Sequence, residues 1–84
     1  MELLSFQFEI ISLLQTCTIS VEWIEVESPT GSFFVGPDHS PLVSVIKNQS
    51  TLRYKQLHAE EKVMSIRSGI FTVSQNKALA LIDQ

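Results

Sequence analysis

The sequence predicts an all-β domain, built as two stacked antiparallel sheets that form a flattened barrel or sandwich. Apolar and polar side chains alternate with period two, first where Phe6, Phe8 and Ile10 alternate with Gln7 and Glu9. Turn-forming residues recur about every eight to twelve positions. No long amphipathic helical pattern follows residue 15, and the chain contains no internal repeat.

The strands are expected in short runs along the whole chain. The first run also partly fits helical spacing through Leu4, Phe8 and Ile11, but its alternation favours a strand. The expected strands cover residues 6–10, 21–27, 33–35, 42–46, 52–55, 63–66, 70–73 and 78–82, and the expected turns cover residues 28–31, 36–41, 48–50, 58–62 and 75–77.

Three residues interrupt this pattern. Trp23 shares the face of the glutamates Glu25 and Glu27, unless a bulge or a sheet end turns it. Gly69 is expected to break the pattern before the strand at 70–73. Successive side chains on a strand point to opposite faces, so Phe33 and Phe34 cannot both face inward, and one of them is expected on the surface or in an interface.

Composition and charge indicate one small protein-binding domain, residues 1–84. Residues 1–46 carry six acidic residues and neither Lys nor Arg, and the net charge is −3. This distribution argues against a nucleic-acid partner, which requires a clustered basic face. The lone Cys17 cannot form an intramolecular disulfide and favours a reducing compartment.

The apolar N-terminal stretch, residues 1–14, does not resemble a signal peptide. It contains Glu2 and Glu9, lacks a basic segment at its start and has no small-residue cleavage site. It is also too short to span a bilayer. The sequence therefore predicts a cytoplasmic chain.

The sequence offers few candidates for chemistry. Asp38, His39 and Ser40 are consecutive, which does not make a catalytic triad, because triad members must converge in space. His39 and His58 with Asp38 or Glu60 could hold a metal, but a loop-bonded and a solvated histidine are the favoured interpretation. There is neither a phosphate-binding loop nor a dinucleotide fingerprint. We therefore predict no catalytic residue, no cofactor and no metal.

Residues 29–42, PTGSFFVGPDHSPL, resemble the signature of the F-type ATP synthase epsilon subunit, N-terminal β-sandwich domain. The residues that match in register are Gly31, Val35, Pro37, His39, Pro41 and Leu42. Residues 8–12, 21–26, 68–73 and 76–83 resemble further strands of the family in order and spacing. The chain departs from the pattern at Phe34, where the family has glycine, at Ser40, at Gln49–Ser50 and at Arg67.

The resemblance implies a non-catalytic central-stalk subunit that binds the gamma subunit and the c-ring and couples proton or sodium translocation to ATP synthesis. The implied c-ring contacts are Thr30, Gly31, Ser32 and Phe33, and the expected gamma-subunit contacts are Asp38, His39, Pro41 and Leu42. The implied location is peripheral, at the cytoplasmic face of the cell membrane. Family members usually continue into an inhibitory two-helix domain where this chain ends, so a form without that helical hairpin is expected.

Two other functions compete with this expectation. The first is a free-standing β-sandwich adaptor that binds a different protein. The second is an enzyme that uses the loop around Asp38 and His39, with or without a metal. Binding to the gamma subunit separates the first alternative from the epsilon-like function, and the metal content of the purified protein tests the second.

Overall fold

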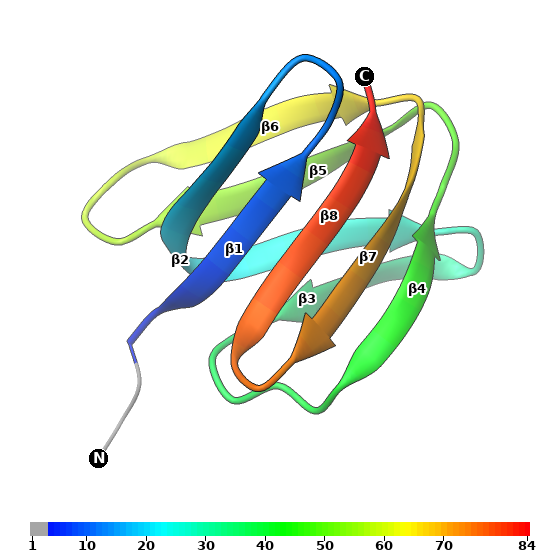
Figure 1. The fold of residues 1–84 in the computed structure, drawn as a ribbon. Coiled ribbons are helices and arrows are strands. Elements are labelled where there is room, and N and C mark those ends of the chain that lie inside the picture. Colours follow the sequence, from blue (N-terminus) through cyan, green and yellow to red (C-terminus); the bar gives the residue numbers. More distant parts are fainter. Residues whose placement is uncertain (1–3) are drawn as a thin grey trace.

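Eight β-strands make up the part of the chain that the computed structural model describes, residues 4–84, and no helix occurs in it (Figure 1). The all-β prediction is confirmed. The strands are β1 (Phe6–Ile11), β2 (Thr16–Ser28), β3 (Gly31–Val35), β4 (Leu42–Ile46), β5 (Ser50–Gln56), β6 (Glu61–Ile66), β7 (Ser68–Ser74) and β8 (Lys77–Asp83). Accordingly, no helix long enough to cross a bilayer occurs in these residues. The first three residues of the N-terminal apolar stretch lie outside the described part of the chain.

The strands form one sheet that curls back on itself into two layers. Its order is β4-β7-β8-β1-β2-β5-β6, and β3 pairs with β2 alone. The 13-residue strand β2 belongs to both layers, because its first half pairs with β1 and its second half with β3 and β5. Figure 1 shows β1, β8, β7 and β4 in front of β3, β5 and β6. The curled sheet gives the stacked layers expected of a sandwich.

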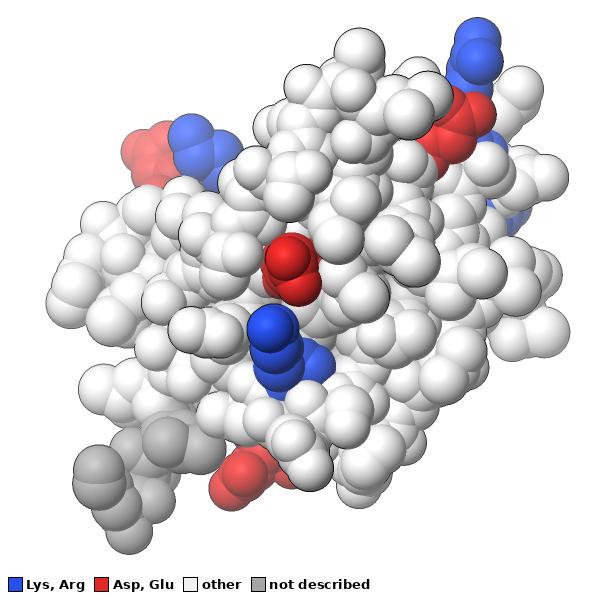
Figure 2. Space-filling model, in the orientation of Figure 1, with Lys and Arg blue, Asp and Glu red and all other residues white. Residues whose placement is uncertain are grey.

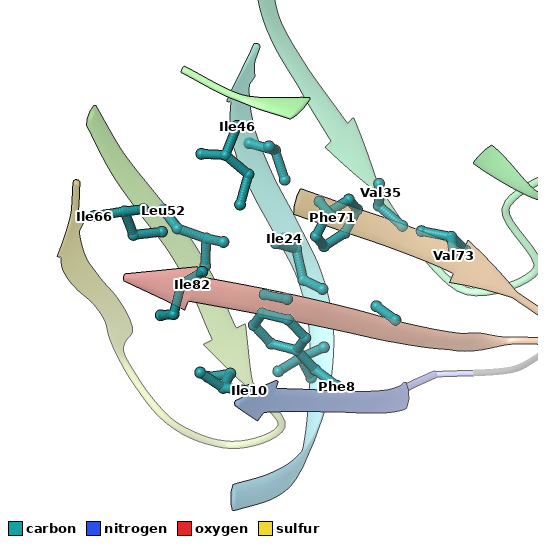
Figure 3. Close-up of a cluster of buried hydrophobic side chains, with 14 of the residues drawn as sticks. Phe8, Ile10, Ile24, Val35, Ile46, Leu52, Ile66, Phe71, Val73 and Ile82 are labelled. Carbon is teal, nitrogen blue, oxygen red and sulfur yellow. The ribbon is translucent and has the colours of Figure 1, made fainter. Parts of the chain in front are cut away.

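Alternating strand residues meet between the two layers and form one core (Figure 3). Phe71 of β7 packs edge-on against Phe33 of β3, with ring centroids 6.2 Å apart. Phe8 of β1 likewise contacts Tyr54 of β5 at 5.8 Å. These pairs join the front layer to the back layer and stabilise their stacking. The core consists of Phe6, Phe8, Ile10, Val21, Ile24, Val26, Val35, Ile46, Leu52, Ile66, Phe71, Val73, Ala78, Ala80 and Ile82.

Several details differ from the expectation. The strand expected at 21–27 begins at Thr16, and the connections at residues 12–15 and at Arg67 were not among the expected turns. One strand pair, β1 with β8, is parallel, although both sheets were expected to be wholly antiparallel.

Gly69 does not break the pattern, because it lies inside β7 opposite Ile82. A Cβ on Gly69 would lie 2.6 Å from the carbonyl oxygen of Leu81. The glycine therefore permits a close approach of two backbones within the sheet.

Trp23 and the two adjacent phenylalanines lie as the alternation requires. Trp23 lies on the outer face with Glu25 and Glu27, and the shift in the pairing of β2 with β5 between Val21 and Trp23 allows Val21 to point into the core. On the outer face, the ring of Trp23 lies 5.4 Å from that of Phe34, which is 56% exposed. Phe33 points the opposite way and packs against the core. The expectation that one of the two phenylalanines is on the surface is confirmed.

Candidate protein-interaction site

The outer face of β3, β2, β5 and β6 is polar, and its charges are paired. The Nε of Arg53 donates to Glu25 at 2.6 Å, and the Nζ of Lys55 donates to Glu22 at 2.8 Å. Arg53 also lies 3.9 Å from Glu61 on the neighbouring strand. Pairing across strands satisfies these charges without any outside partner. Apart from the aromatic pair Trp23–Phe34 and the exposed Val63 of β6, this face has the character of a solvated surface.

The outer face of β4, β7, β8 and β1 is apolar. The register aligns Val45 with Ile70, Ile70 with Leu81, and Leu81 with Ile11. We call these four residues the apolar row. With strands about 4.8 Å apart, the row is about 14 Å wide. Val45, Ile70 and Leu81 are 58%, 46% and 44% exposed.

Further apolar residues extend this face beyond the row. Val43, which is 78% exposed, precedes Val45 on the same side of β4, and Leu79 precedes Leu81 on β8. Figure 2 looks onto this side, whose surface is largely uncharged, with an acidic and a basic group near the centre and the other charges along its edges. On it, Lys77 and Glu9 approach each other at 4.0 Å. An exposed apolar patch with so little charge is typical of a surface that a partner covers.

An open groove of about 560 Å³ overlaps the apolar row and lies between the β1–β2 loop and the adjoining ends of β7 and β8. Ile70, Leu81 and Leu13 are among its lining residues. The hydroxyl oxygen of Ser12 accepts hydrogen bonds from the backbone N–H groups of Leu14 and Gln15, which fixes the loop. In this loop the side chain of Leu13 is fully exposed to solvent and that of Leu14 is 79% exposed.

The turn that joins β2 to β3 carries the residues expected to contact the c-ring. The Ser28 hydroxyl donates to the carbonyl of Gly31 at 2.7 Å and accepts from the N–H of Thr30 at 3.3 Å. Thr30, Gly31 and Ser32 are exposed, whereas Phe33 is half-buried and points inward. Gly31 has a φ of 140°, which strains any other residue. The exposed end of this hairpin is thus Pro29 to Ser32.

The residues expected to contact the gamma subunit lie at the opposite end of β3, in the loop between β3 and β4. Asp38 and Pro41 are exposed, His39 is half-buried, and Leu42 begins β4 and packs against the core. The Nδ1 of His39 lies 2.7 Å from the carbonyl of Ser40, to which its N–H donates. Gly31 and Val35 are separated by about 13 Å along the strand, so the two sets of residues are distinct sites.

Two ionisable groups have shifted pKa values for identifiable reasons. The hydrogen bond from Lys55 holds the pKa of Glu22 below its usual value of 4.5, and the charge of Lys55 adds to this effect. Burial raises the pKa of Tyr54, whose ring packs against Phe8 in the core. Both shifts follow from packing and pairing within the sheet, and neither group lies on the apolar row.

The alternative of a metal site around the histidines gains no support. His39 lies in the β3–β4 loop and His58 in the β5–β6 turn. Across residues 4–84, no three His, Cys, Asp or Glu side chains converge as a metal site would require.

Sequence reasoning missed the apolar row, although a signal for it is present. The segment 42–46 has the sequence LVSVI, with apolar side chains at both parities instead of the alternation of a half-solvated strand. The same is true of the segment 78–82, ALALI. Continuous apolar runs are typical of strands that are covered on both faces. This signal corresponds to the apolar outer faces that β4 and β8 have in the structure.

Comparison with known proteins agrees with this architecture. A chain in the structure of the Euglena gracilis mitochondrial ATP synthase, with OSCP, F1 and c-ring, has a TM-score of 0.89 at 12% identity over 98% of this chain. A chain in the central stalk and c-ring structure of the Tetrahymena thermophila mitochondrial ATP synthase has a TM-score of 0.80 at 8% identity over 93% of this chain. The matches span 52% and 63% of those chains. At these identities the likeness establishes the fold.

The match to a sequence family is more specific. The family described as the beta-sandwich domain of the ATP synthase Delta/Epsilon chain matches residues 5–84. This range contains all eight strands, from Phe6 to Asp83. The chain therefore belongs to the ATP synthase Delta/Epsilon chain, beta-sandwich domain family.

Proposed function

We propose that this domain is a central-stalk element of a rotary F-type ATP synthase, and that it binds the gamma subunit and the c-ring. The observation that carries the proposal is the apolar row on one outer face of a chain that belongs to the Delta/Epsilon family. The domain itself catalyses nothing in this proposal. It transmits rotation between the ion-driven ring and the catalytic part of the complex, which together synthesise ATP.

The apolar row is the proposed contact for the gamma subunit. Val45, Ile70 and Leu81 are each about half exposed, and the polar outer face on the other side of the domain already has paired charges. Covering the row removes apolar surface from water, worth about 25 cal/mol per Å² of buried area. The β3–β4 loop lies beside this face, because its last residues lead directly into β4. Asp38, His39 and Pro41 would then form the rim of the same interface.

The end of the β2–β3 hairpin is the proposed contact for the c-ring. The turn of this hairpin is open to a partner, because residues 29–32 are all exposed. The Ser28 hydrogen bonds fix the turn before any partner arrives, which lowers the entropy lost on binding. Thr30, Gly31 and Ser32 offer hydroxyl and backbone groups, so this contact would be polar and uncharged. In this arrangement the domain is peripheral, at the cytoplasmic face of the membrane.

Titration of the purified gamma subunit with two matched lysine variants tests the gamma contact. Ile70→Lys places a charge in the apolar row, and Val63→Lys places the same charge at an exposed valine on the opposite outer face. We expect Ile70→Lys to weaken binding at least tenfold, roughly the effect of burying an unpaired charge, and Val63→Lys to change it less than twofold.

The wild-type titration distinguishes the competing functions. If the wild-type chain forms no complex with the gamma subunit at micromolar concentration, the stalk function is wrong and a free-standing adaptor is favoured. If both lysine variants bind equally well, the domain binds the gamma subunit through another surface.

The ratio of ATP-driven ion pumping to ATP hydrolysis in the assembled complex tests the ring contact. Ser32→Trp adds bulk at the exposed end of the hairpin, while Ser65→Trp adds it on β6 in the same layer. Gly31 is left unchanged because its φ of 140° would make any variant there a test of backbone strain. We expect Ser32→Trp to lower ATP-driven ion pumping relative to ATP hydrolysis and Ser65→Trp to leave the ratio unchanged. An unchanged ratio in both variants would remove the hairpin from the proposal.

A further inference from the structure

A side chain of the β7–β8 turn reaches across to the loop between β3 and β4. The turn consists of Gln75 and Asn76, with φ values of 51° and 60°. The Oδ1 of Asn76 accepts a hydrogen bond of 2.7 Å from the backbone N–H of Asp38. Asn76 is accordingly half-buried, whereas Gln75 is exposed.

The geometry of the turn does not require this bond. Two consecutive residues with positive φ form the two-residue hairpin connection that matches the twist of the strands, and glycine or asparagine serves equally well there. Of the hydrogen bonds outside the strand ladders in residues 4–84, this is the one that links the 36–41 loop to another element. The other bond of the loop, from His39 to Ser40, is local. The side chain of Asn76 therefore holds the loop to the sheet through this hydrogen bond.

The bond acts at the start of β4. Leu42 pairs with Val73, so the loop and the turn lie at the same end of the front layer, as Figure 1 shows. β4 is an edge strand that pairs only with β7, and it carries Val43 and Val45 of the apolar face. Asp38 itself has a φ of 63°, a conformation that is unfavourable without compensating contacts. Without the hydrogen bond from Asp38 to Asn76, the loop could leave the conformation in which it borders the apolar row.

We propose that Asn76 is a positioning residue: by holding Asp38 it fixes the 36–41 loop and the beginning of β4 in the arrangement that receives the gamma subunit. This inference rests on the proposed function. A net hydrogen bond of ordinary strength corresponds to about a three- to tenfold change in an equilibrium constant. Asn76 would contribute this much to affinity without touching the partner.

Two glycine variants of the same turn test the inference. Asn76→Gly keeps the positive φ and removes the acceptor, while Gln75→Gly makes the same backbone change beside it and leaves the bond intact. Hydrogen exchange of the Asp38 amide, followed by NMR, reports the bond directly. Titration with the purified gamma subunit reports the affinity. We expect Asn76→Gly to accelerate exchange at Asp38 and to weaken binding about three- to tenfold, with Gln75→Gly like wild type in both.

Asn76→Asp provides the conservative rescue, because aspartate keeps an acceptor oxygen and tolerates a positive φ. It should retain slow exchange at Asp38 and affinity close to that of wild type. The inference is overturned if the two glycine variants bind equally, if Asp38 exchanges at the same rate in both, or if Asn76→Asp behaves like Asn76→Gly. A wild-type chain that fails to bind the gamma subunit would instead reject the proposed function, so the two failures are distinguishable.

Discussion

At the scale of single residues, the backbone adopts the left-handed conformation at several positions that have a side chain. These positions all lie in turns or loops, and they are Asp38, Gln49, His58, Gln75 and Asn76. The left-handed region costs about 1–2 kcal/mol for an ordinary L-residue. Asp38 and Asn76 have short polar side chains that lower this cost, and the side chain of Asn76 also accepts a hydrogen bond from the backbone N–H of Asp38. Gln49 does not have a short polar side chain of this kind and so has the full steric cost of the conformation.

Gln49→Gly is therefore expected to stabilise the domain. Gln49 has a φ of 54°, and glycine removes the steric cost of that conformation while adding some entropy to the unfolded chain. The net gain in free energy of unfolding should be about 0.5–1 kcal/mol, measured by urea denaturation. Asn48→Gly in the same turn is the control, because Asn48 does not have a positive φ and should gain nothing. Equal stabilisation by both variants would contradict this explanation.

Gly69→Ala should destabilise the domain strongly, although it adds only one methyl group. The added Cβ would lie 2.6 Å from the backbone oxygen of Leu81 and 3.2 Å from the Cα of Ile82, and backbone atoms cannot move aside without shifting β8. Overpacking of this kind costs about 1–3 kcal/mol. Gly36→Ala is the matched control, since nothing lies within 4 Å of its Cβ position. Chemical denaturation of both variants measures the difference, and equal stability would show that β7 and β8 can separate freely.

At the scale of elements, the hairpin of β2 and β3 has aromatic contacts on both of its faces. On the outside, Trp23 of β2 pairs with Phe34 of β3 and joins the two strands, while inside Phe33 contacts Phe71 of β7. We expect a double-mutant cycle of Trp23→Ala and Phe34→Ala to give a coupling of about 0.5–1.5 kcal/mol in unfolding free energy. Additive effects would mean that the two rings lie beside each other without stabilising the hairpin.

The ion pair between Glu22 of β2 and Lys55 of β5 predicts that the stability of the domain depends on pH. The folded pKa of Glu22 is below its usual value of 4.5, so this pair stabilises the domain above about pH 4.5 and loses its effect as the pH falls through the folded value. Lys55→Gln removes the charge and should flatten the decline of melting temperature below pH 4.5. Lys62→Gln, at an exposed lysine on β6, is the control. An unchanged pH profile in Lys55→Gln would contradict the assigned cause of the pKa shift.

At the scale of the whole molecule, the two outer faces differ in whether they need a partner to shield them from water. The polar outer face pairs its own charges, whereas the apolar row leaves Val45, Ile70 and Leu81 in contact with water. A domain of 84 residues is only marginally stable by itself. A partner that covers the row should therefore raise the stability of the domain as well as bind it.

The melting temperature of the domain should rise with added gamma subunit. At a free partner concentration of 100 times the dissociation constant, the stabilisation is about 2.7 kcal/mol. Ile70→Lys should shift this dependence to higher gamma-subunit concentrations, and Val63→Lys should not. Differential scanning fluorimetry of the domain, labelled to separate its transition from that of the partner, gives the measurement. A transition that does not depend on the partner would contradict binding to the native state.

Much of the local structure could be predicted from the sequence, because it depends on neighbouring residues. Alternation at Phe6, Phe8 and Ile10 specified a strand, and prolines at 37 and 41 specified the loop between β3 and β4. Adjacent Phe33 and Phe34 had to separate to opposite faces, as they do. The candidate loop and turn were located correctly as elements, and their roles as contacts stay predictions.

The sequence by itself thus determined the all-β class, most of the turns and the family to which the chain belongs. Only the tertiary structure decided that β1 lies parallel to β8, that Gly69 lies inside a strand, and that Asn76 holds Asp38. It also decided that Val45, Ile70, Leu81 and Ile11 form one row. The physical reason is register: residues far apart in the chain become neighbours only when strands pair, and no local pattern encodes which strands pair.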